Sequence, residues 1–98
     1  MKTMTTQQVR ELVESKQTIN LIDVRETNEV AAGKIPGAIN IPLGLLEFRM
    51  NELDKSKEYI MVCRSGGRSG QATNFLENHG YKVTNTDGGM LDWNGETN

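Results

Sequence analysis

Cysteine and histidine are almost missing from this chain, which has one of each, Cys63 and His79. A single cysteine excludes an intramolecular disulfide, and one cysteine with one histidine cannot supply the four ligands of a Cys/His zinc site. We therefore expect no metal, and a chain this short would hold a large enclosed cofactor pocket only with difficulty, so we also expect no cofactor. Any chemistry at Cys63 is that of a lone thiol.

Strong net charge and long apolar runs are missing as well. The formal net charge is −2, which creates no field that would attract nucleic acid or an anionic membrane. No apolar run approaches the roughly 20 residues that span a bilayer, and residues 1–10 lack the apolar stretch of a secretory signal. We expect neither nucleic acid nor membrane as a partner, and a cytoplasmic location as the default.

What the chain has is the composition of a small globular protein. Its 98 residues are 36% hydrophobic and 24% charged, with only 2 prolines, which excludes the disordered and collagen-like classes. This length predicts a single domain over residues 1–98, with motifs from about 19 to 93 and a polar tail at 94–98. We expect its functional site to be a shallow pocket at an edge.

Short apolar runs alternate with amphipathic stretches. Thr5 and Gln8 have the spacing of a capping box and precede a helical apolar pattern to about Ser15. The pattern further predicts helices over 27–32, over 45–50 and from 68 or 69 to the turn containing His79, and strands over 19–24, 38–41, 59–62 and 82–86. This alternation predicts a three-layer α/β/α sandwich with a small parallel sheet, joined by right-handed crossovers. Sites in such folds form at the carboxyl ends of the strands.

The segment 62–69, Val-Cys-Arg-Ser-Gly-Gly-Arg-Ser, places Cys63 between an apolar strand and the start of a helix. A helix N-terminus and nearby cations can lower a thiol pKa from about 8.5 to about 7.5 or below. Gly66 and Gly67 can both adopt positive φ, so successive N–H groups could form a concave anion site around the sulfur. We expect Cys63 to be ionised and reachable by solvent, although a cysteine that ends a strand often serves only in packing.

Four segments in order resemble the motifs of the rhodanese domain family, at similar spacing. They are Asp23–Glu26, Gly33–Pro42, the loop that begins at Cys63, and Gly88–Trp93. One departure is Lys34, because many members of that family have histidine at this position.

The resemblance implies a sulfurtransferase in which Cys63 attacks a sulfur donor and carries the transferred sulfur as a persulfide. It also implies thiosulfate or another sulfane-sulfur compound as the donor, and cyanide, a small thiol or a thiol protein as the acceptor. Backbone N–H groups and a serine hydroxyl would hold the anionic sulfur, and the two arginines would attract the sulfonate of the donor. The expected substrate-binding residues are Arg64, Ser65, Gly66, Gly67, Arg68 and Ser69.

One alternative is that the chain is a persulfide carrier or a protein-binding module with little turnover of small molecules. Another is a phosphatase. Related phosphatases have a loop one residue longer, whereas four residues, 64–67, separate Cys63 from Arg68, which leaves a ring too tight for phosphate, so we expect phosphatase activity to be absent or slight.

Asp23 and Arg25 alternate at a strand end. We expect them to support the site through an ion pair or a loop anchor with a residue such as Glu29.

Overall fold

In the computed structural model, which describes all 98 residues, five strands form one sheet in the order β1-β5-β4-β2-β3. Every neighbouring pair is parallel. The strands are β1 (Lys2–Thr5), β2 (Leu21–Asp23), β3 (Ile39–Asn40), β4 (Glu58–Val62) and β5 (Lys82–Asp87). The α-helices are α1 (Thr6–Glu14), α2 (Thr27–Ala31), α3 (Leu46–Arg49) and α4 (Gly67–Asn78). Three 3-10 helices complete the fold: η1 (Leu43–Leu45), η2 (Met50–Glu52) and η3 (Gly89–Asp92).

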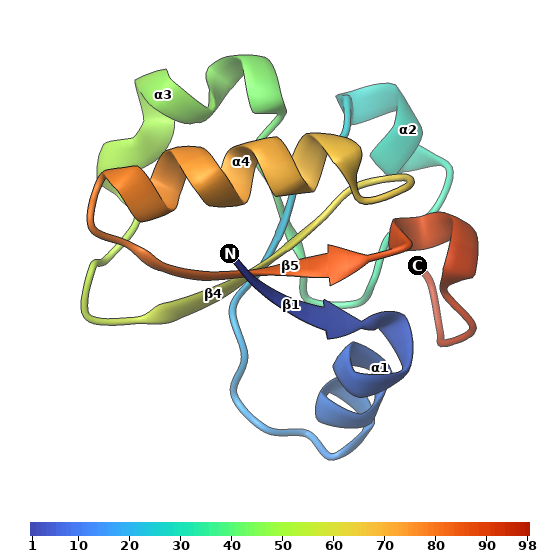
Figure 1. The fold of residues 1–98 in the computed structure, drawn as a ribbon. Helices are drawn as coiled ribbons and strands as arrows, with labels where there is room; N and C mark the ends of the chain where they lie inside the picture. The colour runs from blue at the N-terminus through green and yellow to red at the C-terminus, as the bar shows by residue number, and fades with distance from the viewer.

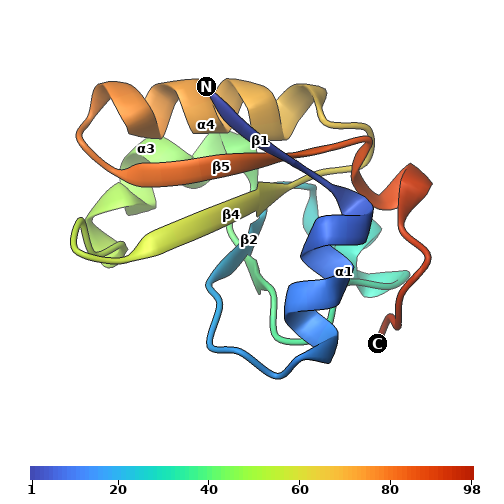
Figure 2. The same ribbon diagram turned by 60° about the horizontal axis from the view of Figure 1, so that its bottom comes forward.

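Helices cover both faces of the sheet. Figure 1 shows α3 and α4 on one face and α1 on the other, and Figure 2 shows the same three layers after a turn of 60°. The predicted α/β sandwich with a small parallel sheet is confirmed. No helix has the length and apolar character needed to cross a membrane.

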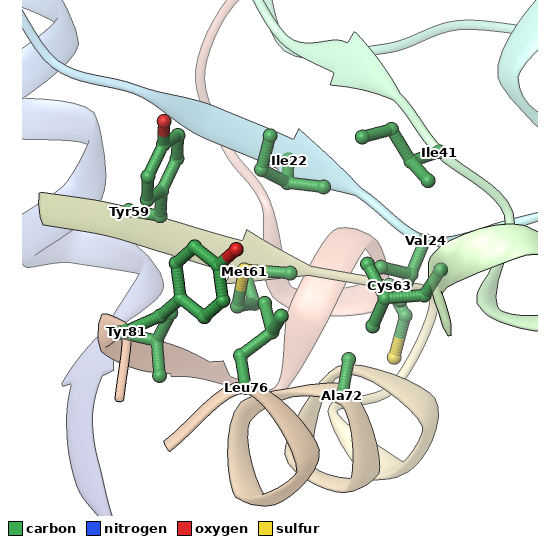
Figure 3. Close-up of a cluster of buried hydrophobic side chains, with 11 residues drawn as sticks. Ile22, Val24, Ile41, Tyr59, Met61, Cys63, Ala72, Leu76 and Tyr81 are labelled. Carbon is green, nitrogen blue, oxygen red and sulfur yellow. The ribbon is translucent and has the colours of Figure 1, made fainter. Parts of the chain in front are cut away.

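Alternation along β4 divides the core into two clusters, because successive strand residues point to opposite faces. Met61 and Cys63 belong to the cluster beneath α4, whereas Ile60 and Val62 belong to the cluster beneath α1. Figure 3 shows the first cluster, in which Cys63 points toward α4 and Ala72. β4 therefore lies in the centre of the fold, and its last residue leads directly into Cys63.

The capping box predicted at Thr5 and Gln8 begins α1. The Gln8 backbone N–H donates to Thr5 Oγ1 at 3.1 Å, and the Thr5 N–H donates to Gln8 Oε1 at 2.9 Å. The strand before it, β1, was not predicted, because its side chains are mostly exposed and carry no apolar alternation. Backbone pairing with β5 from Lys2 to Thr5 holds it in the sheet.

Two helical predictions need adjustment. The helix expected over 45–50 is instead the succession of η1, α3 and η2. It begins with a tight turn in which the Leu45 N–H donates to the Pro42 carbonyl, and Gly44 is a weak helix former at the same point. The helix expected from residue 68 or 69 begins at Gly67.

Candidate functional site

Cys63 follows β4 at the carboxyl end of the sheet, between β2 and β5, and α4 begins four residues later at Gly67. The loop between them is held from the other side by η3. The Met90 N–H donates to the Cys63 carbonyl at 2.9 Å, and the Leu91 N–H donates to the Arg64 carbonyl at 2.9 Å. These bonds turn the two carbonyls away from the sulfur, so the loop is free to present N–H groups to it.

Two donors point at the sulfur. The Gly66 N–H lies 3.1 Å from Cys63 Sγ, and the Ser69 hydroxyl lies 3.3 Å from the same atom. Gly66 adopts a φ of 103°, in the left-handed region that favours glycine. Gly67 does not have a positive φ, because it is already the first residue of α4. The expectation that both glycines could adopt positive φ is therefore wrong for Gly67.

A side chain from β5 fixes the orientation of this loop. Asn85 Nδ2 donates to the Gly66 carbonyl at 3.2 Å, and the Gly70 N–H donates to the same carbonyl at 3.0 Å. In a trans peptide the carbonyl and the following N–H point in opposite directions. The Gly67 N–H therefore points away from Asn85 and from the Gly70 N–H, which both bind the Gly66 carbonyl.

The sulfur is more buried than expected. Cys63 is 1% exposed and packs in the cluster that includes Val24 and Ala72, so the expectation that solvent reaches it is wrong. The side chain points inward, under α4, rather than out of the sheet edge (Figure 3). The expected shallow pocket is also missing from this loop, since no cavity is lined by residues 63–69, and the largest, about 340 Å³, lies beside Asn20 and Glu58 at the opposite end of the strands.

Opposing effects act on the pKa of the Cys63 thiol. Burial raises it, because a thiolate loses hydration. Hydrogen bonds from the Ser69 side chain and from the backbone N–H groups of Ser69, Gly66 and Ser65 lower it, and together they prevail. The pKa of Cys63 therefore lies below its ordinary value of 9.0, and the environment favours the nucleophilic form.

Alkylation by iodoacetamide tests this pKa. Because the thiolate is the reactive form and its folded pKa is lowered, the alkylation rate of the folded protein should rise with pH and level off through a midpoint below that of the unfolded chain. Ser69→Ala, which removes a hydroxyl donor but leaves the backbone donors, should move the midpoint upward. The urea-unfolded chain is the control, and a folded midpoint equal to the unfolded one would contradict the expected stabilisation of the thiolate.

The two arginines of the loop have different surroundings. Arg64 is exposed, and no carboxylate contacts it. Arg68 donates from Nη1 and Nη2 to the two carboxylate oxygens of Glu29, on α2, at 2.6 and 2.9 Å. The hydrogen bond from Arg68 lowers the pKa of Glu29 to about 2.

The family model described as "Rhodanese-like domain" matches residues 5–96. The chain belongs to the rhodanese-like domain family. A solved structure, that of a rhodanese-like domain protein from Staphylococcus aureus, superposes with a TM-score of 0.92 at 33% identity, covering 98% of this chain and 94% of that one.

Two Bacillus subtilis relatives of this rhodanese-like domain carry names that refer to sulfur. "Putative sulfurtransferase YtwF" is 45% identical over 96 residues, which cover 98% of this chain and 93% of the relative. "Putative sulfur carrier protein YrkF" is 42% identical over 89 residues, which cover 90% of this chain but only 48% of the relative. Sulfur transfer in general is the activity class that these relationships support.

Asp23 and Arg25 form the buried ion pair of this rhodanese-like domain, beside β4. Arg25 Nη2 donates to Asp23 Oδ2 at 2.8 Å and to the Gly33 carbonyl at 2.8 Å. The expected ion pair is present, but the two residues make it with each other, because the Glu29 carboxylate is bound to Arg68. Their contact with the Gly33 carbonyl ties the segment after α2 to the end of β2.

Three residues beside the loop were not predicted to be there: Glu29 as the partner of Arg68, Asn85 as an anchor of Gly66, and Gly89. A Cβ at Gly89 would overlap the Cys63 and Arg64 carbonyls. The Gly-Gly pair after a predicted strand was visible in the sequence, but it is most simply a turn, and nothing local indicates which loop it touches. His79 lies at the other end of α4, with Nδ1 2.8 Å from the Phe75 carbonyl, and Met90 and Trp93 pack against the α1-side cluster.

Proposed function

We propose that this chain is a sulfurtransferase that moves a sulfane sulfur from thiosulfate or a related donor to cyanide or a thiol, with Cys63 carrying the sulfur as a persulfide. The observation that carries the proposal is the Cys63 sulfur at a strand end, hydrogen-bonded by the Gly66 N–H and the Ser69 hydroxyl, with a lowered pKa. A cysteine held only for packing needs neither donor.

The reaction proceeds in two halves. In the first, the Cys63 thiolate attacks the outer sulfur of thiosulfate, a new S–S bond forms, and the old one breaks as sulfite leaves with its electron pair. In the second, cyanide or a thiolate attacks the outer sulfur of the persulfide, and the Cys63 thiolate leaves. Charge balances in each half without a general base, because both nucleophiles and both leaving groups are anions.

The surrounding residues take separate roles in this scheme. The backbone N–H groups of Ser65, Gly66 and Ser69, with the Ser69 hydroxyl, stabilise the anionic sulfur. Arg64, which is exposed and has no carboxylate partner, attracts the sulfonate of the donor. Because Cys63 is buried, the loop has to move away from the sulfur before a donor can reach it.

Cys63→Ser tests the proposal directly. With thiosulfate, the unaltered chain should release sulfite and gain the mass of one sulfur atom, whereas Cys63→Ser should do neither, a loss of activity to the level of the blank. His79→Gln, at the far end of α4, is the matched control and should keep full turnover. Sulfite release that survives in Cys63→Ser would exclude Cys63 as the sulfur carrier.

A second candidate function is a persulfide carrier that delivers sulfur to a protein. It is favoured by the burial of Cys63, which restricts small donors, and by the similarity to a protein named as a sulfur carrier. Comparing steady-state turnover of thiosulfate and cyanide with transfer of one sulfur atom from a persulfidated protein distinguishes the two. Slow turnover combined with rapid single transfer would indicate the carrier.

A further inference from the structure

Glu29 is held in place on both sides. One carboxylate oxygen, Oε1, accepts from the Glu26 backbone N–H at 2.9 Å within the capping box of α2 and also from Arg68 Nη1. The other oxygen accepts from Arg68 Nη2. The side chains of Arg68 and Glu29 are 35% and 28% exposed, so the pair lies at the surface beside the loop.

This pair changes the charge that a donor meets. Glu29 is ionised throughout the physiological range, because its pKa is held at about 2. Hydrogen bonding to Glu29 raises the pKa of Arg68, and the charge of Cys63 adds to the effect, so this guanidinium lies within the electric field of the sulfur. Its charge is nevertheless matched by Glu29, and among the two loop arginines only Arg64 is without a carboxylate partner.

The consequence depends on the charge of the donor. Thiosulfate carries two negative charges and would gain most from a bidentate guanidinium, but at Arg68 it has to displace a carboxylate already bound in that way. An organic persulfide, R–S–SH, is uncharged at its sulfur end when protonated and does not need that guanidinium.

Building on the proposed sulfurtransferase function, we propose that Glu29 is a specificity-determining residue that masks Arg68, so that the site disfavours dianionic donors and favours organic persulfides. In the favoured reaction the Cys63 thiolate attacks the outer sulfur of R–S–SH. The S–S bond of the donor breaks, the thiolate R–S⁻ leaves with the electron pair and takes up the proton of the transferred sulfur, and R–SH is released while Cys63 carries the anionic persulfide. No oxidant or reductant is required.

Glu29→Gln tests this role, because it removes the charge and keeps the shape. The KM for thiosulfate should fall about 10-fold, the range expected when a charge-assisted contact becomes available to the donor. The KM for 2-hydroxyethyl persulfide should change by less than about twofold, since that donor does not use the guanidinium. Glu77→Gln removes the same charge near the far end of α4 and should leave both values unchanged.

An unchanged or raised KM for thiosulfate in Glu29→Gln, or an equal change for both donors, would overturn the proposal. A measurement without any variant covers the case in which Glu29→Gln does not fold. On the unaltered chain, sulfate should inhibit the persulfide reaction no more strongly than methanesulfonate does, and a strong preference for the dianion would also overturn it. If the unaltered chain accepts sulfur from neither donor, the proposed function itself fails, which is a different result.

Discussion

Gly89→Ala is expected to abolish sulfur transfer and to destabilise the fold. The added Cβ would overlap the Cys63 carbonyl and lie 2.6 Å from the Arg64 carbonyl oxygen, both of which are backbone atoms of the loop. Gly89 also has a φ of 57°, where alanine costs about 1–2 kcal/mol. With overpacking of about 1–3 kcal/mol added, the free energy of unfolding should fall by about 2–5 kcal/mol. Displacing the loop by about 1 Å should reduce turnover about 100-fold or more.

Urea denaturation and thiosulfate turnover measure the two effects of Gly89→Ala, and Gly37→Ala is the matched control. Gly37 has a φ of 84°, but no atom lies within 4 Å of the position its Cβ would occupy. In Gly37→Ala the free energy of unfolding should fall only by the cost of the backbone conformation, about 1–2 kcal/mol, and the activity should be kept. Equal losses of stability in the two variants, with turnover retained in both, would show that contact with the loop carbonyls is unimportant.

Asp23→Asn should also cause a large loss of stability, although it alters no residue of the loop. The Asp23 side chain is fully buried and that of Arg25 is 8% exposed, so removing the carboxylate charge leaves a buried guanidinium without its counter-ion. Breaking such a pair costs about 3–5 kcal/mol, a large part of the stability of a chain this size. Thermal and urea unfolding, monitored by circular dichroism, would measure it.

Glu14→Gln is the control for Asp23→Asn, because Glu14 forms an exposed i,i+4 pair with Arg10. Glu14→Gln should lower the free energy of unfolding by less than about 0.5 kcal/mol. Adding Arg25→Met to Asp23→Asn should recover part of the stability, since the unpaired charge is then gone. If Asp23→Asn costs no more than Glu14→Gln, the buried pair does not stabilise the fold as its geometry indicates.

The central part of the fold could be predicted from the sequence because its signals are local. The apolar run at 59–62 predicts β4, and the capping box predicts the start of α1. The position of Cys63 between a strand and a helix follows from the same patterns, and so does the approach of N–H groups to its sulfur.

What could not be predicted depends on contacts between distant segments. β1 has no apolar alternation, and it forms because its backbone pairs with the edge of β5. The pairing of Arg68 with Glu29 joins residues that are far apart in the sequence, and an arginine at a helix start gives no indication of its partner. The burial of Cys63 likewise depends on how closely Ala72 of α4 packs over it, which short motifs do not encode.

β1 pairs with β5, so this ladder at the edge of the sheet joins residues 2–5 to residues 84–87, which are distant in the sequence. Such non-local pairing slows folding, because the entropy of closing a long loop is lost before the new contacts compensate for it. During synthesis, the central strand β4 remains without its β5 neighbour until residues 82–87 have left the ribosome. The thiol that precedes α4 is thus assembled into its finished surroundings only after β5 has paired with β4.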